Sequence, residues 1–126
     1  MNIQCILGFN KGYELIKDHK LPIQVAYRMA KLTKKCQEDY DFYRKKMNEI
    51  IQEYGQRDEQ GNYVYDEQGV SILIQEDKKK ECRQAMLELE NLDCDGYNNI
   101  LIPITALADM EFTPEELEPL VPFLEE

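Results

Sequence analysis

The feature that most constrains the fold is a long run without glycine or proline between Pro22 and Gly55. Proline is tolerated in a first helical turn because its missing N–H would have no partner there, and glycine commonly follows the last turn. Apolar side chains within the run recur every three or four residues, which places them in one stripe on a helix. The sequence therefore predicts a helix over about residues 22–54. We call the following residues the apolar stripe: Met29, Leu32, Cys36, Tyr40, Tyr43, Met47, Ile50 and Tyr54.

A second, shorter helix is predicted over about residues 77–92, where apolar residues again share one face at helical spacing. Short connections favour antiparallel neighbours, so we expect this helix to lie antiparallel to the long one. A long helix cannot bury its stripe alone, and the cover must come from the shorter helix or from a second molecule. The apolar face of the shorter helix consists of Cys82, Ala85, Met86, Leu89 and Leu92.

The four-residue motif Asp-Glu-Gln-Gly occurs twice between the two helices, at Asp58–Gly61 and at Asp66–Gly69. It fits a type I turn followed by a glycine with positive φ, which is a common connection in β-hairpins. The flanking segments Asn62–Tyr65 and Val70–Gln75 are rich in β-branched and aromatic residues, as strands are. The sequence therefore predicts a β-hairpin over about residues 62–75.

The same acidic stretch does not match a calcium loop of the EF-hand type. Such a loop needs glycine at its sixth position and a glutamate at its twelfth. Counted from Asp58, the fourth position is Gly61 and the twelfth is Gly69. We therefore expect two turns around a strand and no metal site.

Further strands are predicted near both ends of the chain. Asn2–Phe9 alternates between apolar and polar residues, and Asn99–Ile104 is an apolar segment that Pro103 either confines to a sheet edge or ends. We expect the two to join in a small sheet. Thr113 to Glu116 has the residues of a helix start, with threonine as N-cap, proline first and glutamate third. The sequence thus predicts an α+β fold in one domain, residues 1–126, with an acidic C-terminal segment over residues 93–126 that contains a short helix.

The net charge of −10 is distributed unevenly along the chain. All 15 bases lie at or before Arg83, together with 14 acids, whereas the remaining 11 acids follow without any base. An anionic end of this kind repels nucleic acid and anionic membranes and favours basic partners, although it also serves solubility and helix initiation. The candidate partner-binding residues are Asp109, Glu111, Glu115, Glu116 and Glu118.

Motifs that carry enzyme chemistry are missing from the sequence. The single histidine, His19, has no metal-ligand spacing around it, and the single serine, Ser71, lacks the glycines of a nucleophile elbow. The glycines of Gly8–Gly12 do not have the spacing of a phosphate loop. The bases of the long helix alternate with acids, which indicates a solvated face rather than direct nucleic-acid binding. We therefore expect no catalytic residue, no metal ligand, no cofactor and no enzyme activity.

Cysteine usage and hydropathy favour a soluble protein of the cytosol. None of the four cysteines forms a Cys-x-x-Cys pair, so we expect reduced and mostly buried thiols. No leader and no apolar run of membrane-spanning length is found in the sequence.

The run LPIQVAYRMAKLTKKCQEDYDFYRKKMNEIIQEYGQRDEQGNYVYDEQG resembles a family of small phage and prophage proteins of Gram-positive bacteria, classed as a domain of unknown function. The likeness covers roughly Leu21 to Leu92. Glu53–Gly61 corresponds to the sequence motif at the end of the long helix in that family. The resemblance implies a long charged helix, an acidic hairpin or loop, a second short helix and an acidic C-terminus. It also implies a phage accessory protein made in the cytoplasm of a bacterial host, and it brings no catalytic residues.

Three functions follow as hypotheses. The first is a non-enzymatic phage accessory protein that docks its helical stripe or its acidic end on a protein partner. The second is a small virion component of the tail or neck, which would use the long helix for self-association. The third is an acidic inhibitor that mimics nucleic acid and blocks a host defence enzyme.

Overall fold

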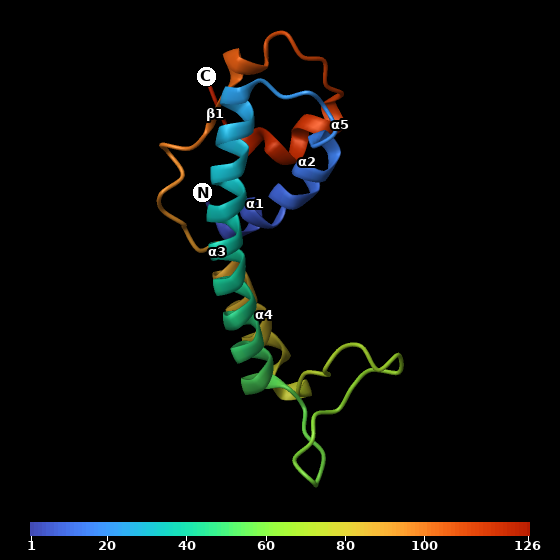
Figure 1. The fold of residues 1–126 in the computed structure, drawn as a ribbon. Coiled ribbons are helices and arrows are strands. Elements are labelled where there is room, and N and C mark those ends of the chain that lie inside the picture. The colour runs from blue at the N-terminus through green and yellow to red at the C-terminus, as the bar shows by residue number, and fades with distance from the viewer. The chain divides into compact units, whose positions relative to one another are not determined.

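The computed structural model describes all 126 residues, which form two compact units. Unit 1 contains Met1–Asp41 and Leu92–Glu126, and unit 2 contains Phe42–Asn91. The helix α3, Ile23–Tyr54, begins in unit 1 and ends in unit 2 (Figure 1). The expectation of one domain stays a prediction, because one continuous helix belongs to both units.

The predicted long helix is confirmed. It begins at Ile23 directly after Pro22, ends at Tyr54 directly before Gly55, and runs for 32 residues without a break. Gly55 does not have the positive φ with which glycine commonly ends a helix. A Cβ atom at Gly55 would lie 2.6 Å from the carbonyl oxygen of Ile51, so the chain leaves the helix where only glycine fits.

Unit 1 contains the termini of the chain and is mostly helical. A parallel two-stranded sheet pairs Ile102 with Leu124 and Pro103 with Glu125. Besides the start of α3, the elements of unit 1 are α1 Ile3–Leu7, α2 Phe9–Ile16, β1 Ile102–Pro103, the 3-10 helix η2 Ile104–Leu107, α5 Pro114–Leu117, the 3-10 helix η3 Glu118–Phe123 and β2 Leu124–Glu125. The α+β class and the short C-terminal helix are confirmed.

The predicted strand Asn2–Phe9 is wrong, because this segment forms α1 and the start of α2. Ile3, Ile6 and Phe9 are the buried residues, and their spacing of three is helical. Asn2 supplies the N-cap, since its side chain accepts the N–H of Cys5 at 2.9 Å. The small sheet therefore does not involve residues 2–9. It joins the end of the predicted segment Asn99–Ile104 to the last residues of the chain.

The core of unit 1 is closed around the first half of α3. The rings of Phe9 and Phe123 meet edge to face with their centroids 5.0 Å apart. A Cβ atom at Gly12 would lie 2.7 Å from Leu120, so the backbone of α2 packs directly against a side chain of η3. The first residues of the apolar stripe belong to this core, and here unit 1 covers the stripe in place of the predicted shorter helix. The buried hydrophobic residues of unit 1 are Ile3, Ile6, Phe9, Ile16, Val25, Met29, Leu32, Cys36, Tyr97, Ile102, Leu120 and Phe123.

Unit 2 contains the end of α3, an irregular segment, the 3-10 helix η1 (Glu76–Lys78) and α4 (Lys79–Glu90). The two predicted turns are confirmed: the N–H of Gly61 donates to the carbonyl of Asp58, and that of Gly69 to the carbonyl of Asp66, both at 3.0 Å. Both glycines have positive φ, 83° and 69°. The side chain of each aspartate also accepts two backbone N–H groups, one from within its turn and one from the residue directly after it.

The predicted hairpin over residues 62–75 is present only in part. Residues 62–65 lie between the two turns, and this segment is too short for a regular β-ladder. The segment also pairs back to residues 55–57, which the sequence reasoning did not foresee. The antiparallel packing of α4 along α3 stays a prediction. The pairings are isolated bridges between Gly55 and Ile74, Arg57 and Tyr63, and Tyr65 and Ile72.

Candidate interaction surfaces

The acidic segment of residues 109–118 is organised around the start of α5. Thr113 accepts the N–H of Glu116 at 3.3 Å through its hydroxyl, and the carboxylate of Glu116 accepts the N–H of Thr113 at 3.0 Å. Pro114 occupies the first helical position. The predicted capping box is therefore confirmed, and it satisfies two backbone donors that a helix end leaves without partners.

His19 connects this segment to the loop between α2 and α3. Its Nε2 atom lies 2.7 Å from the second carboxylate oxygen of Glu116, and its ring lies 5.1 Å from the ring of Phe112. The N–H of Thr113 and then His19 lower the pKa of Glu116 below its usual value. The lone histidine thus has a structural partner that sequence spacing did not indicate, because 97 residues separate the two side chains.

The five candidate acids differ in their surroundings. Asp109, Glu111, Glu115 and Glu118 are exposed, whereas the side chain of Glu116 is only 19% exposed and is held by the cap and His19. Partner binding by these residues stays a prediction, and Glu116 is the member with the least access to a partner.

Two of the acids, Glu115 and Glu118, line a groove of about 520 Å³ between the first two helices and the α5–η3 segment. The groove has an apolar part formed by Leu15, Pro119 and Pro122. Lys11 is the one base among its lining residues. We call Leu15, Glu115, Glu118, Pro119 and Pro122 the proline groove. Sequence reasoning named its acids but missed its apolar residues, since about a hundred positions separate Leu15 from the prolines.

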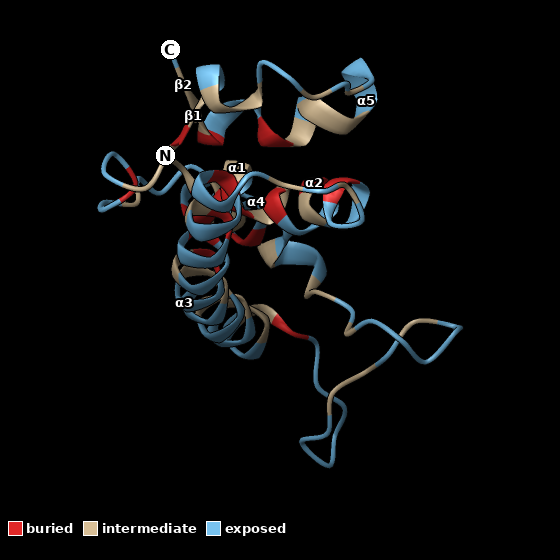
Figure 2. Cartoon of the chain, turned by 45° about the horizontal axis from the view of Figure 1, so that its top comes forward, coloured by how far each residue is buried: buried red, intermediate tan, exposed pale blue.

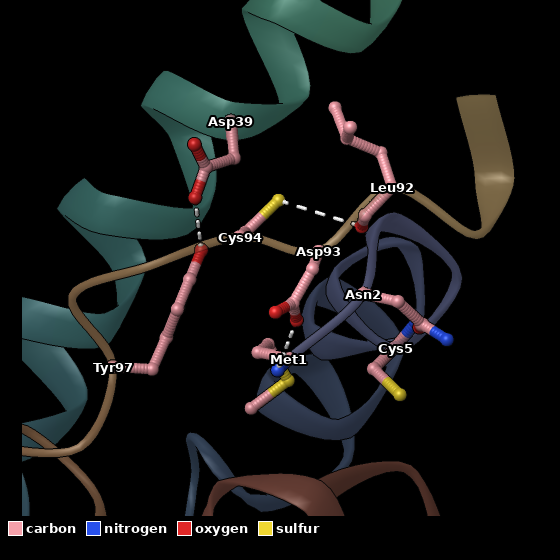
Figure 3. Close-up of polar contacts among 8 residues, drawn as sticks. All are labelled: Met1, Asn2, Cys5, Asp39, Leu92, Asp93, Cys94 and Tyr97. Carbon is pink, nitrogen blue, oxygen red and sulfur yellow. Dashed lines mark hydrogen bonds and ion pairs between the residues drawn. The ribbon is translucent and has the colours of Figure 1, made fainter. Parts of the chain in front are cut away.

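A buried polar cluster attaches the loop before β1 to α3 (Figure 3). The hydroxyl of Tyr97 donates to Asp39 at 2.6 Å and lies 3.8 Å from the sulfur of Cys36. Lys35 lies 3.5 Å from the same carboxylate. Burial and the hydrogen bond to Asp39 raise the pKa of Tyr97, and burial raises the pKa of Cys36 to about 12. Both groups stay protonated near neutral pH, which suits a structural cluster rather than a nucleophile.

A second hollow, of about 400 Å³, lies beside this cluster and is lined by Cys5 and Cys94 among others. The amino group of Met1 lies 3.2 Å from the carboxylate of Asp93 (Figure 3). The N–H of Cys94 donates to the carbonyl of Met1 at 2.6 Å. Burial raises the pKa of Cys94. All four cysteines are free, and no group of three or more His, Cys, Asp or Glu side chains is placed to hold a metal ion.

Unit 2 combines exposed apolar side chains with a small core. Figure 2 shows the irregular segment after α3 almost entirely as exposed or intermediate residues. The stripe residues of unit 2 are only partly buried, and Tyr54 lines a hollow of about 390 Å³ with residues of α4. Large side chains that stand exposed in this unit form what we call the apolar surface of unit 2. They are Phe42, Tyr65, Val70, Leu73 and Leu87.

Comparisons with known proteins return no relative. No protein-family model matches the chain, and neither the curated proteins nor the solved structures give a match. The resemblance to small phage proteins therefore stays a prediction from the sequence motifs. Hydropathy along the helices gives one further result, which is that none of them has the length and apolar character to span a bilayer.

Proposed function

We propose that the protein is a non-enzymatic phage accessory protein that acts in the host cytoplasm by binding another protein. The observation that carries the proposal is the contrast in burial between the two units. Unit 1 buries twelve hydrophobic side chains, whereas unit 2 buries only two, Cys82 and Leu89, each still 8% exposed. A unit of this size with so little core gains stability when a partner covers its apolar residues.

The exposed side chains of unit 2 are of the kind that anchor interfaces. Val70 is 77% exposed and Tyr65 is 52% exposed. Complete burial of one such side chain contributes about 1.5–3 kcal/mol, and tyrosine is enriched where a few residues dominate binding. A partner that covers Tyr65, Val70 and Leu73 together therefore gains apolar burial at three positions.

The absence of enzyme activity is part of the proposal and rests on the chemistry of the residues. The raised pKa values of Cys36 and Tyr97 disfavour a nucleophile or base at the buried cluster. Charge also favours protein over nucleic acid as the partner, because the chain has a net charge of −10. The virion component and the acidic inhibitor stay alternative hypotheses.

Capture from lysates of the phage-infected host, followed by mass spectrometry, tests the proposal. We expect the wild-type protein to retain a specific partner and the Val70→Ser, Leu73→Ser variant to lose it. Val121→Ser is a matched control, because Val121 is 58% exposed but lies in unit 1. A partner held equally by all three proteins, or no partner at all, would refute the proposal. The same measurement on purified particles distinguishes a virion component.

A further inference from the structure

One face of α3 in unit 1 points away from the core and carries exposed apolar side chains. Ile23 is 88% exposed and Tyr27, one turn later, is 57% exposed. At 100° per residue, Ile23, Tyr27, Lys31 and Lys34 fall within about 80° of the helix circumference. The buried residues Val25, Met29, Leu32 and Cys36 lie on the opposite side. We call Ile23, Tyr27, Lys31 and Lys34 the outer face of α3.

The outer face is basic in a protein that is acidic as a whole. No acid occurs between Lys20 and Gln37, although the chain has a net charge of −10. The Nζ atom of Lys31 lies 4.8 Å from the ring centre of Tyr27, and this lysine lowers the pKa of the phenol. A helix face with two apolar anchors and two lysines is suited to a groove that is apolar inside and acidic at its rim.

The proline groove of the same unit has this character. Leu15, Pro119 and Pro122 provide apolar contact. Glu115 and Glu118 provide two carboxylates against the single base Lys11, so the lining is acidic on balance. Leu15 is itself 42% exposed. The groove and the outer face are therefore complementary in both hydrophobicity and charge, and both lie in unit 1.

We propose that the protein self-associates by seating the outer face of α3 from one copy in the proline groove of a second copy. Ile23 and Tyr27 contact the leucine and the prolines, while Lys31 and Lys34 pair with Glu115 and Glu118. The lysines of the outer face and the glutamates of the proline groove are opposite in local charge, so a second copy of the chain is the favoured occupant of the groove. The contact joins two different surfaces, which permits a closed ring, a two-fold dimer with two such contacts, or a chain of copies.

This inference does not depend on the proposed function. The outer face and the proline groove lie in unit 1, whereas the apolar surface of the proposed function lies in unit 2. The apolar surface of unit 2 remains intact in every variant described below. Loss of self-association and loss of a captured partner are therefore separate results.

Charge reversal provides the test, with mass in solution measured by sedimentation equilibrium over a range of protein concentrations. The wild-type protein is expected to exceed its monomer mass of 14.9 kDa. The variants Lys31→Glu, Lys34→Glu and Glu115→Lys, Glu118→Lys are each expected to associate more than about tenfold more weakly, because like charges then meet across the contact. An equal mixture of the two variants should associate like the wild type, since every contact between unlike copies is again complementary.

Salt and a second variant complete the test. Raising salt from about 0.1 M to about 1 M shortens the Debye length from about 10 Å to about 3 Å and should weaken the wild-type association. The variant Lys45→Glu, Arg83→Glu has the same net charge as Lys31→Glu, Lys34→Glu but alters exposed positions of unit 2, and it should associate normally. Circular dichroism confirms that each variant is folded. A monomeric wild type would overturn the proposal, and so would folded variants that associate normally or a mixture that stays monomeric.

Discussion

Replacing Tyr97 by phenylalanine removes one hydroxyl group from the buried cluster and keeps the ring in place. Tyr97 is 3% exposed, and its hydroxyl donates to the carboxylate of Asp39 at 2.6 Å. A hydrogen bond to a charged group contributes about 1.5–3 kcal/mol. Two features reduce the loss: Asp39 keeps Lys35 at 3.5 Å, and its side chain is 19% exposed, so that water replaces part of the bond. We therefore expect Tyr97→Phe to lower the free energy of unfolding by about 1–2 kcal/mol.

Urea denaturation followed by circular dichroism measures this loss. A double-mutant cycle with Asp39→Asn isolates the pair, because the loss from the second substitution should be smaller when the hydroxyl is already absent. Tyr97→Ala serves as the upper limit, since it also empties the space of a buried ring and should cost about 3–5 kcal/mol. A loss below about 0.5 kcal/mol for Tyr97→Phe, within the range of ordinary surface substitutions, would refute the account of the cluster.

Three further predictions concern unit 1. Gly12→Ala should destabilise the protein by about 1–3 kcal/mol through overpacking, because the new Cβ atom would lie 2.7 Å from Leu120; thermal unfolding that is unchanged would contradict this packing. Thr113→Ala should cost about 1 kcal/mol through loss of the N-cap, and Thr113→Ser should restore most of it in the same urea assay. The lowered pKa of Glu116 stabilises the fold above the unfolded-state pKa of this carboxyl, and the contribution is lost as pH falls through the lower folded-state value. Unfolding midpoints measured across this acidic range should therefore fall less steeply for Glu116→Gln than for the wild type, and parallel curves would reject the linkage.

Long and local patterns in the sequence predicted the structure well. The helix over residues 22–54 was placed to within one residue, because eight apolar positions keep one period and a proline and a glycine mark the ends. The cap at Thr113 and the two Asp-Glu-Gln-Gly turns were also recognisable, since each depends on residues three positions apart.

Short patterns and distant contacts were not predictable in the same way. Over residues 2–9 the alternation of apolar residues competes with the spacing of Ile3, Ile6 and Phe9, and the N-cap at Asn2 decides for a helix. Strands of two residues, such as β1 and β2, leave no periodic signal at all. The proline groove and the pair of His19 with Glu116 join segments about a hundred residues apart, so only tertiary structure brings them together.

The apolar stripe explains why the two units differ. One helix carries the same kind of side chain along its whole length, but unit 1 supplies aromatic and aliphatic neighbours such as Phe123 and Ile102, while unit 2 supplies short turns rich in acids and amides. Because a turn segment held by Asp58 and Asp66 satisfies its own backbone, it adds order without adding apolar cover. Folding thus satisfies the hydrogen bonds of unit 2 and leaves its apolar side chains half covered. A surface with paired polar groups and uncovered apolar groups can bind a partner without first breaking internal contacts, and this is the physical basis for the proposal that unit 2 binds a protein partner.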